Sequence, residues 1–200
     1  MQSYLYGTIN QKAHYGTDDP TINLYADAAF AVHPSDSKSH GGIYVTLGKD
    51  TGPIYVRSSK IKAVCTSICE AELWKLVEGV QRTYPLAKLL EEIGVIESLQ
   101  ITVHEDNMAA IIISYAGEGR TTKSKHFRVR FDFLKQMLED GTIILKHCAS
   151  PDMVPDYLTK GMVGEKYIRL TTKSLGLNRK GSVTPGTTAA QKAVVKIAKT

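Results

Sequence analysis

The sequence is poor in cysteine and has no long apolar run. Its three cysteines, Cys65, Cys69 and Cys148, cannot all pair with one another, and no cluster of histidine and cysteine has the spacing of a zinc site. No stretch approaches the roughly 20 apolar residues of a membrane span, and the residues after Met1 do not form a secretory leader. We therefore expect a protein of a reducing intracellular compartment, and a content of 42% hydrophobic residues excludes a wholly disordered chain.

Charge is distributed unevenly along the chain. Residues 1–178 hold 20 basic and 20 acidic side chains, so the net charge of +5 lies entirely in residues 179–200. A second basic concentration falls between residues 120 and 135, where six basic side chains accompany a single acid, Asp132. Both stretches suit a polyanionic partner such as a nucleic acid, but a solvated helix face explains the second equally well.

Composition divides the chain into three parts. Residues 1–20 end at a turn signal and are interpreted as the end of a preceding segment. Residues 21–177 carry the hydrophobic periodicity of one domain, and residues 178–200 form a basic tail that we expect to be flexible.

Within the central part, hydrophobic periodicity predicts an α/β domain with one mixed sheet covered by helices. A capping box, Ser67 and Glu70, starts the first helix, which Gly94 ends and which Pro85 should kink or restart. The other expected helices cover residues 107–115, the stretch from Phe127 to Asp140, residues 152–160 and residues 165–175. Strands are expected at residues 21–30, 42–47, 53–57, 98–104 and 142–148.

Two aspartates occupy positions in or at the end of expected strands where a charged residue is unusual. Asp27 lies inside the apolar run of the first strand, where an unpaired charge is costly. Asp106 ends the fourth strand, and the carboxyl ends of central strands are where open α/β sheets place ligands. The alternatives are a solvated edge position for Asp27 and simple helix capping for Asp106.

Two further acids lie on helices. Glu70 already serves the capping box, which leaves Glu72 free to face a site, and Asp156 begins a late helix, where the helix dipole alone could favour it. Four carboxylates without histidine or cysteine select Mg²⁺ or Mn²⁺ over zinc. Two such ions about 4 Å apart can align a water and a leaving oxygen for phosphodiester cleavage. The sequence therefore predicts a site for two Mg²⁺ ions, for which Mn²⁺ can substitute.

Six short motifs stand out in the central part. They are YADAAF from Tyr25, SSK from Ser58, CEAEL from Cys69, EDNMAAI from Glu105, SKHFRVR from Ser124 and DYLTK from Asp156. In this order they resemble the ribonuclease H domain of copia-type LTR retrotransposon Pol polyproteins, over roughly residues 21–177. Residues 4–8 are similar to the segment that joins the reverse transcriptase to that domain.

The resemblance implies a ribonuclease H-like fold with a five-stranded mixed sheet of order 3-2-1-4-5, an antiparallel second strand and flanking helices. It implies that Asp27, Glu72, Asp106 and Asp156 are catalytic metal ligands. The implied enzyme is an endonuclease that hydrolyses the RNA strand of RNA/DNA hybrids during reverse transcription, leaving 5′-phosphate and 3′-hydroxyl ends. The reverse transcriptase domain of the same polyprotein would be its partner, with no membrane and no small-molecule cofactor, in cytoplasmic virus-like particles and, as a further location, the nucleus.

Recognition of a hybrid should combine contacts to 2′-hydroxyl groups with contacts to phosphates. Residues beside the two strand aspartates are candidates for the RNA strand, and an outward basic helix face is the candidate for the DNA strand. Asn107 suits the start of a helix equally well, and Lys160 can steady a phosphate or be solvated. The expected substrate-binding residues are Ala28, Ala29, Asn107, Lys125, Arg128, Lys135 and Lys160.

Two other functions remain open from the sequence. An integrase or transposase of the same superfold would use Glu139 as its third acid in place of Glu72. A catalytically silent remnant would bind nucleic acid through the basic helix face and the tail without cutting it.

Overall fold

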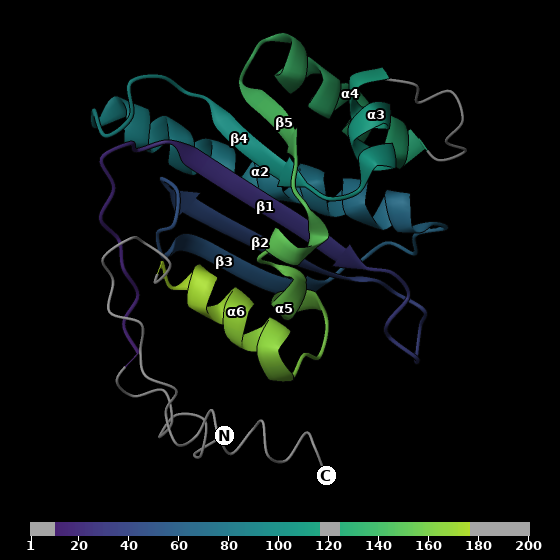
Figure 1. Cartoon of the computed structure of the whole chain (residues 1–200). Coiled ribbons are helices and arrows are strands. Elements are labelled where there is room, and N and C mark those ends of the chain that lie inside the picture. The colour runs from purple at the N-terminus through teal and green to yellow at the C-terminus, as the bar shows by residue number, and fades with distance from the viewer. Residues whose placement is uncertain (1–10, 117–124, 177–200) are drawn as a thin grey trace.

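A five-stranded sheet lies at the centre of the fold (Figure 1). The computed structural model describes residues 11–116 and 125–176, apart from the side chains of residues 125–127. The strands are β1 (Ile22–Ala29), β2 (His40–Leu47), β3 (Pro53–Lys60), β4 (Ile101–Glu105) and β5 (Ile143–His147). Their order is β3-β2-β1-β4-β5; β2 is antiparallel to both neighbours, whereas β1, β4 and β5 are parallel. The expected ribonuclease H-like sheet is confirmed.

Helices cover both faces of the sheet. The long helix α2 lies behind β1 and β2, and the short α5 and α6 lie in front of β2 and β3 (Figure 1). Helices α3 and α4 pack against each other and against β5. The helices are α2 (Ile68–Glu92), α3 (Met108–Ala116), α4 (Lys125–Glu139), α5 (Asp156–Thr159) and α6 (Gly164–Ser174).

The central strand β1 is apolar along almost its whole length because both of its faces are covered. Leu24 and Ala26 are fully buried, and α2 contributes Leu76 and Val80 to the same core. Asp27 is therefore a charged residue in a buried strand, 2% exposed. This burial on a central strand excludes the solvated edge position that the sequence left open for Asp27.

The boundaries of several elements differ from the sequence-based expectation. Helix α2 continues through Pro85 and does not restart there, because Pro85 lies on the exposed face, where water can solvate the carbonyl that loses its amide partner. The expected helix 152–160 is a 3-10 turn, η1 (Ser150–Asp152), followed by α5. Residues 1–10 and 177–200, which hold half of the expected preceding segment and the whole of the expected tail, lie outside the described residues.

Close backbone approach seats α5 on the sheet. A Cβ added to Gly42 would lie 3.0 Å from both the Cβ of Leu158 and the carbonyl oxygen of Pro155, so a side chain here would require α5 to shift away from β2. The Ser58 hydroxyl on β3 also donates to the carbonyl of Leu158, at 2.7 Å. These contacts bring the acid at the start of α5 to the end of β1 that carries Asp27.

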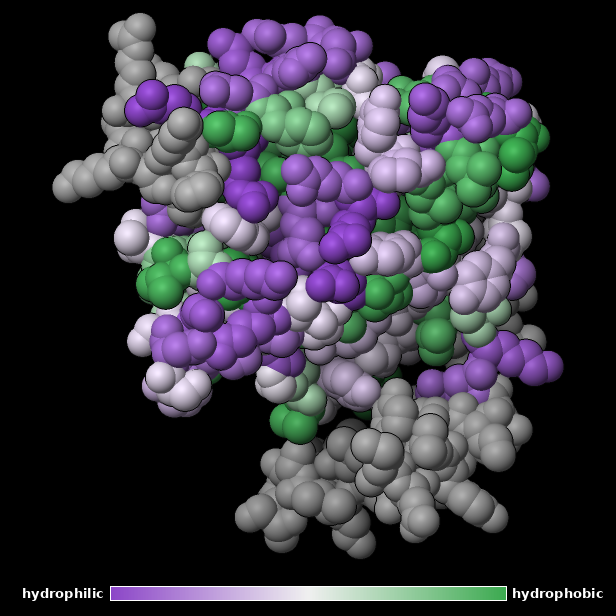
Figure 2. Space-filling model, turned by 180° about the vertical axis from the view of Figure 1, so that it is seen from behind, coloured by the Kyte–Doolittle hydropathy of each residue, from purple (hydrophilic) through white to green (hydrophobic). Residues whose placement is uncertain are grey.

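The face behind the sheet holds a buried lysine. Lys75 on α2 is fully buried, and its ammonium group donates to Ser59, at 2.9 Å, and to Glu78, at 3.0 Å. Glu78 also pairs with Arg57 at 3.0 Å. Seen from behind, hydrophilic residues gather at the middle of this face with hydrophobic residues beside them (Figure 2).

None of the helices in the described ranges is long and apolar enough to cross a membrane.

Candidate metal centre

Three carboxylates from three elements meet at one end of the sheet. Asp27 comes from β1, Glu72 from the first turns of α2, and Asp106 directly follows β4. Each contributes one oxygen atom to a group in which these atoms all lie within 4.8 Å of one another. Parallel pairing of β1 with β4 produces this meeting, because it brings the carboxyl ends of the two strands to the same edge.

Burial and mutual repulsion raise the pKa of two of these carboxyl groups. Burial is the main cause for Glu72, and the nearby charges of Glu105, Asp27 and Asp106 raise its pKa further. Burial also raises the pKa of Asp27, while a hydrogen bond from the Thr159 hydroxyl opposes that rise. The backbone amide of Ala28 and the charge of Lys160 lower the pKa of Glu72, but they do not offset the effect of burial. The Lys160 ammonium, 4.0 Å from Asp27, opposes these increases without reversing them, so the carboxylates favour a further cation.

The group has the chemistry of a divalent cation site. All its donors are carboxylate oxygens, which are the ligands that Mg²⁺ and Mn²⁺ prefer. Glu72 is 4% exposed, and its Oε2 atom has no hydrogen-bond partner among the described residues. Such an unpaired buried oxygen is costly unless a cation or a proton receives it. Asp27, Glu72 and Asp106 can therefore hold a metal ion.

Another buried acid at this place, Glu105, was missed by the sequence analysis. Its side chain is fully buried at the end of β4; Oε1 accepts the backbone amide of Asn107 at 3.1 Å, and Oε2 has no partner in the described part of the chain. Burial raises its pKa, and Asp106 and Asp27 add to the rise. The signal was present, because Ile101, Val103 and Glu105 alternate along the strand and share its inward side.

Asp156 lies beside the three carboxylates but is held by lysines. Its Oδ1 is 2.5 Å from the ammonium of Lys160 and its Oδ2 is 2.5 Å from that of Lys166. These two hydrogen bonds lower its pKa although burial alone would raise it. The Lys160 ammonium is also 4.0 Å from Asp27, so Asp156 adjoins the group through Lys160 rather than as one of its members.

An open groove runs past the candidate metal centre. Among its lining residues are the three grouped carboxylates and four of the expected substrate-binding residues: Ala28, Ala29, Asn107 and Lys160. The Asn107 side chain also caps α3, because its Oδ1 accepts the amides of Ala109 and Ala110 at 3.0 and 3.2 Å. Asn107 therefore has the helix-start role that the sequence left open, and Asp106 remains available to the metal centre.

The basic helix face lies on α4, which packs on α3, α2 and β5. Arg128 is exposed, whereas Lys135 pairs with Glu139 at 3.7 Å. Arg130 stacks on Trp74 with its guanidinium carbon 3.7 Å from the ring centre, so one member of the basic concentration serves packing. The side chain of Lys125 lies outside the described residues.

The structure distinguishes Glu72 from Glu139 as the acid that accompanies Asp27 and Asp106. Glu72 is grouped with Asp27 and Asp106, whereas the side chain of Glu139 is 68% exposed on α4 and is paired with Lys135. The Glu70 side chain is occupied at the start of α2, where it accepts the Thr66 hydroxyl at 2.7 Å. The geometry thus favours Glu72 among the acids that the sequence left open.

The sheet order and the carboxylates at the ends of β1 and β4 define a ribonuclease H-like domain. No family model matches the chain. It is 27% identical over 164 residues, 82% of the chain, to the retrovirus-related Pol polyprotein from transposon TNT 1-94 of Nicotiana tabacum. It is 26% identical over 177 residues, 88% of the chain, to that from transposon RE1 of Arabidopsis thaliana.

The chain spans 12% of the length of each of these two relatives. Among solved structures, LC11-RNase H1, isolated from compost by a metagenomic approach, is similar with a TM-score of 0.47 and 16% identity, over 70% of this chain and 92% of that one. Over most of its length the chain is thus homologous to copia-type retrotransposon Pol polyproteins, which confirms the resemblance found in its motifs.

Proposed function

We propose that this chain is the ribonuclease H domain of a retrotransposon Pol polyprotein and hydrolyses the RNA strand of RNA/DNA hybrids. The observation that carries the proposal is the meeting of Asp27, Glu72 and Asp106 within 4.8 Å beside an open groove. Homology to Pol polyproteins supports the same conclusion. In this proposal residues 21–177 form the domain, residues 1–20 end the polymerase connection and residues 178–200 are a basic tail.

Asp27, Glu72 and Asp106 would hold divalent cations, with Asp156 as the fourth ligand once its lysines release it. Bound Mg²⁺ or Mn²⁺ would supply an activated water and charge neutralisation for phosphodiester hydrolysis, leaving a 5′-phosphate and a 3′-hydroxyl. Lys160 and the backbone at Ala28 and Ala29 line the groove where the RNA strand would lie. Arg128 and Lys135 on α4, with Lys125, would bind phosphates of the DNA strand. The proposed partner is the reverse transcriptase domain of the same polyprotein, in cytoplasmic particles or the nucleus.

The test is cleavage of end-labelled RNA annealed to DNA, with and without Mg²⁺. We expect cutting that requires the metal, and a loss of about a hundredfold or more in Asp27→Asn, Glu72→Gln and Asp106→Asn. The matched control is Glu139→Gln, which removes an exposed acid from α4 and should leave cutting unchanged. Undiminished cutting by the first three variants would refute the site.

The same experiment decides between the alternatives. Loss of activity in Glu139→Gln with activity retained in Glu72→Gln would indicate the integrase-like nuclease. Salt-dependent binding of the hybrid without metal-dependent cleavage would indicate a silent nucleic-acid-binding remnant.

A further inference from the structure

Both carboxylate oxygens of Asp156, the proposed fourth metal ligand, are neutralised by ammonium groups of the chain itself. Asp156 is 5% exposed, and Lys160 from the end of α5 and Lys166 from α6 each approach one of its oxygens at 2.5 Å. Two charge-assisted hydrogen bonds of this kind offset the cost of burying the carboxylate. Asp156 therefore does not need a metal ion for its charge to be balanced.

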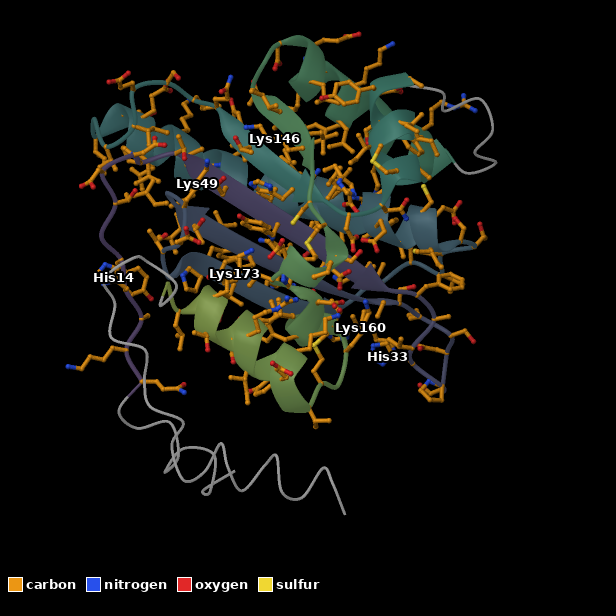
Figure 3. The ribbon with its side chains drawn as sticks, viewed as in Figure 1. His14, His33, Lys49, Lys146, Lys160 and Lys173 are labelled. Atoms are coloured by element: carbon orange, nitrogen blue, oxygen red, sulfur yellow. The ribbon has the colours of Figure 1, made fainter. Side chains whose placement is uncertain are left out.

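Lys160 differs from Lys166 in its second contact. Its ammonium group is also 4.0 Å from Oδ1 of Asp27, and the other oxygen of Asp27 accepts the hydroxyl of Thr159. The Lys160 charge thus lies between the carboxylates of Asp27 and Asp156, at the end of the sheet beside α5 (Figure 3). An ion shared by Asp27 and Asp156 would need this same position.

The remaining carboxylates have no such neutralising group. Neither Glu72 nor Asp106 forms an ion pair with lysine or arginine in the described part of the chain, and Oε2 of Glu72 has no hydrogen-bond partner there. One cation position, among Asp27, Glu72 and Asp106, is therefore open, and the neighbouring position is occupied by a lysine.

We propose that the ammonium group of Lys160 takes the position of the second divalent cation between Asp27 and Asp156, so that this ion binds only in competition with Lys160. The inference rests on the proposed function, because it concerns the same metal-binding carboxylates. Lys160 also lines the groove, where a substrate phosphate is an alternative partner for its ammonium group. The free protein then holds one tightly bound divalent ion, and the second ion enters as Lys160 turns to the substrate.

The test is a titration of the substrate-free protein with Mn²⁺, in which calorimetry measures the heat of binding and electron paramagnetic resonance measures free Mn²⁺. The wild type should bind one ion tightly. Lys160→Met should bind two, with the affinity for the second ion raised by about tenfold or more because the competing charge is gone. Lys160 is a surface residue with a side chain 48% exposed, so the variant should keep the fold, which thermal unfolding checks.

Two further variants separate the role of Lys160 from general effects of charge. Lys160→Arg keeps a cation at the position and should bind one ion. Lys166→Met removes the other charge next to Asp156, but Lys166 forms no ion pair with Asp27, so it should also bind one ion.

The outcomes distinguish this inference from the proposed function. One ion in Lys160→Met, or two ions of similar affinity in the wild type, would overturn the inference and leave the metal centre standing. Absence of Mn²⁺ binding in the wild type would overturn the metal centre and the inference together.

Discussion

The Thr159 hydroxyl donates a hydrogen bond to Oδ2 of Asp27 across 132 positions of sequence. It joins the last turn of α5 to the central strand, and the same hydroxyl also lies 3.1 Å from the carbonyl of Asp156. This bond favours the charged form of Asp27, because it lowers a pKa that burial raises. Thr159 thus orients one proposed metal ligand while lying next to another.

Replacing Thr159 by valine should weaken metal binding. Valine keeps the shape of the side chain but removes the donor, so the Asp27 carboxylate loses both its orientation and a bond that favours ionisation. Loss of such a supporting hydrogen bond typically costs about 10-fold to 100-fold in metal affinity, and Mn²⁺ titration measures it. Thr159→Ser keeps the hydroxyl and should bind Mn²⁺ almost as the wild type does; equal weakening in both variants would point to packing instead.

Gly41 should not tolerate a side chain. A Cβ at this position would lie 2.4 Å from Cε of Lys75, and Lys75 cannot move aside because it is buried and held by Ser59 and Glu78. We expect Gly41→Ala to lower the free energy of unfolding by about 1–3 kcal/mol, the usual cost of overpacking. Urea unfolding measures the loss. Gly161→Ala is the control, because an added Cβ there meets nothing within 4 Å; similar losses in both would argue against the clash.

Much of the fold could be predicted from local patterns. Alternation and apolar runs located the five strands, and the capping box at Ser67 located the start of α2. Of the two outcomes expected at Pro85, a kink or a restart, the restart was wrong because a proline rule does not include tertiary context. The position faces water, and packing on both sides of it keeps the helix continuous. The break between η1 and α5 was not predicted, because the place of α5 depends on the packing of Leu158 and Pro155 against Gly42, far away in the sequence.

Residues of the site could be predicted only where their local sequence context is unusual. Asp27 is recognisable as a charge in an apolar run, whereas Glu105 is recognisable only from the alternation of buried positions along its strand. The two ammonium groups on Asp156 depend on where α6 places Lys166, which no local pattern contains. Sequence therefore predicted the proposed ligands but not the charges that balance them.

Burial of Glu105 predicts that the metal-free protein loses stability as the pH rises. Burial, then Asp106 and Asp27, raise the pKa of Glu105 from its ordinary value of 4.5 to about 8. Between these values the folded protein keeps a proton that the unfolded chain releases. The free energy of unfolding should therefore fall as the pH rises from about 4.5 to about 8, by at most about 1.4 kcal/mol per pH unit from this group.

Glu105→Gln tests this origin of the pH dependence. Glutamine keeps the oxygen that accepts the Asn107 amide but cannot ionise, so the variant should be more stable than the wild type at pH 8 and its stability should change less with pH. Urea unfolding in the presence of a chelator at several pH values measures both effects. Glu97→Gln, at an exposed position, should leave the pH dependence unchanged. An unaltered slope in Glu105→Gln would assign it to another group.

The effect of Asp27→Asn on the free energy of unfolding should change sign when metal is added. Without metal, the substitution relieves repulsion among Asp27, Glu72 and Asp106, and the neutral side chain is less costly to bury, so the free energy of unfolding should rise. With Mg²⁺ at about 100 times its dissociation constant, the wild type should gain about 2.7 kcal/mol, whereas Asp27→Asn should gain little because a ligand is missing. Urea unfolding with chelator and with Mg²⁺ compares the two proteins, and Asp132→Asn, which removes an exposed acid on α4, should follow the wild type in both. If Asp27→Asn is less stable than the wild type without metal, the three carboxylates do not repel one another strongly enough to require a cation, and the physical reason for placing one among them is lost.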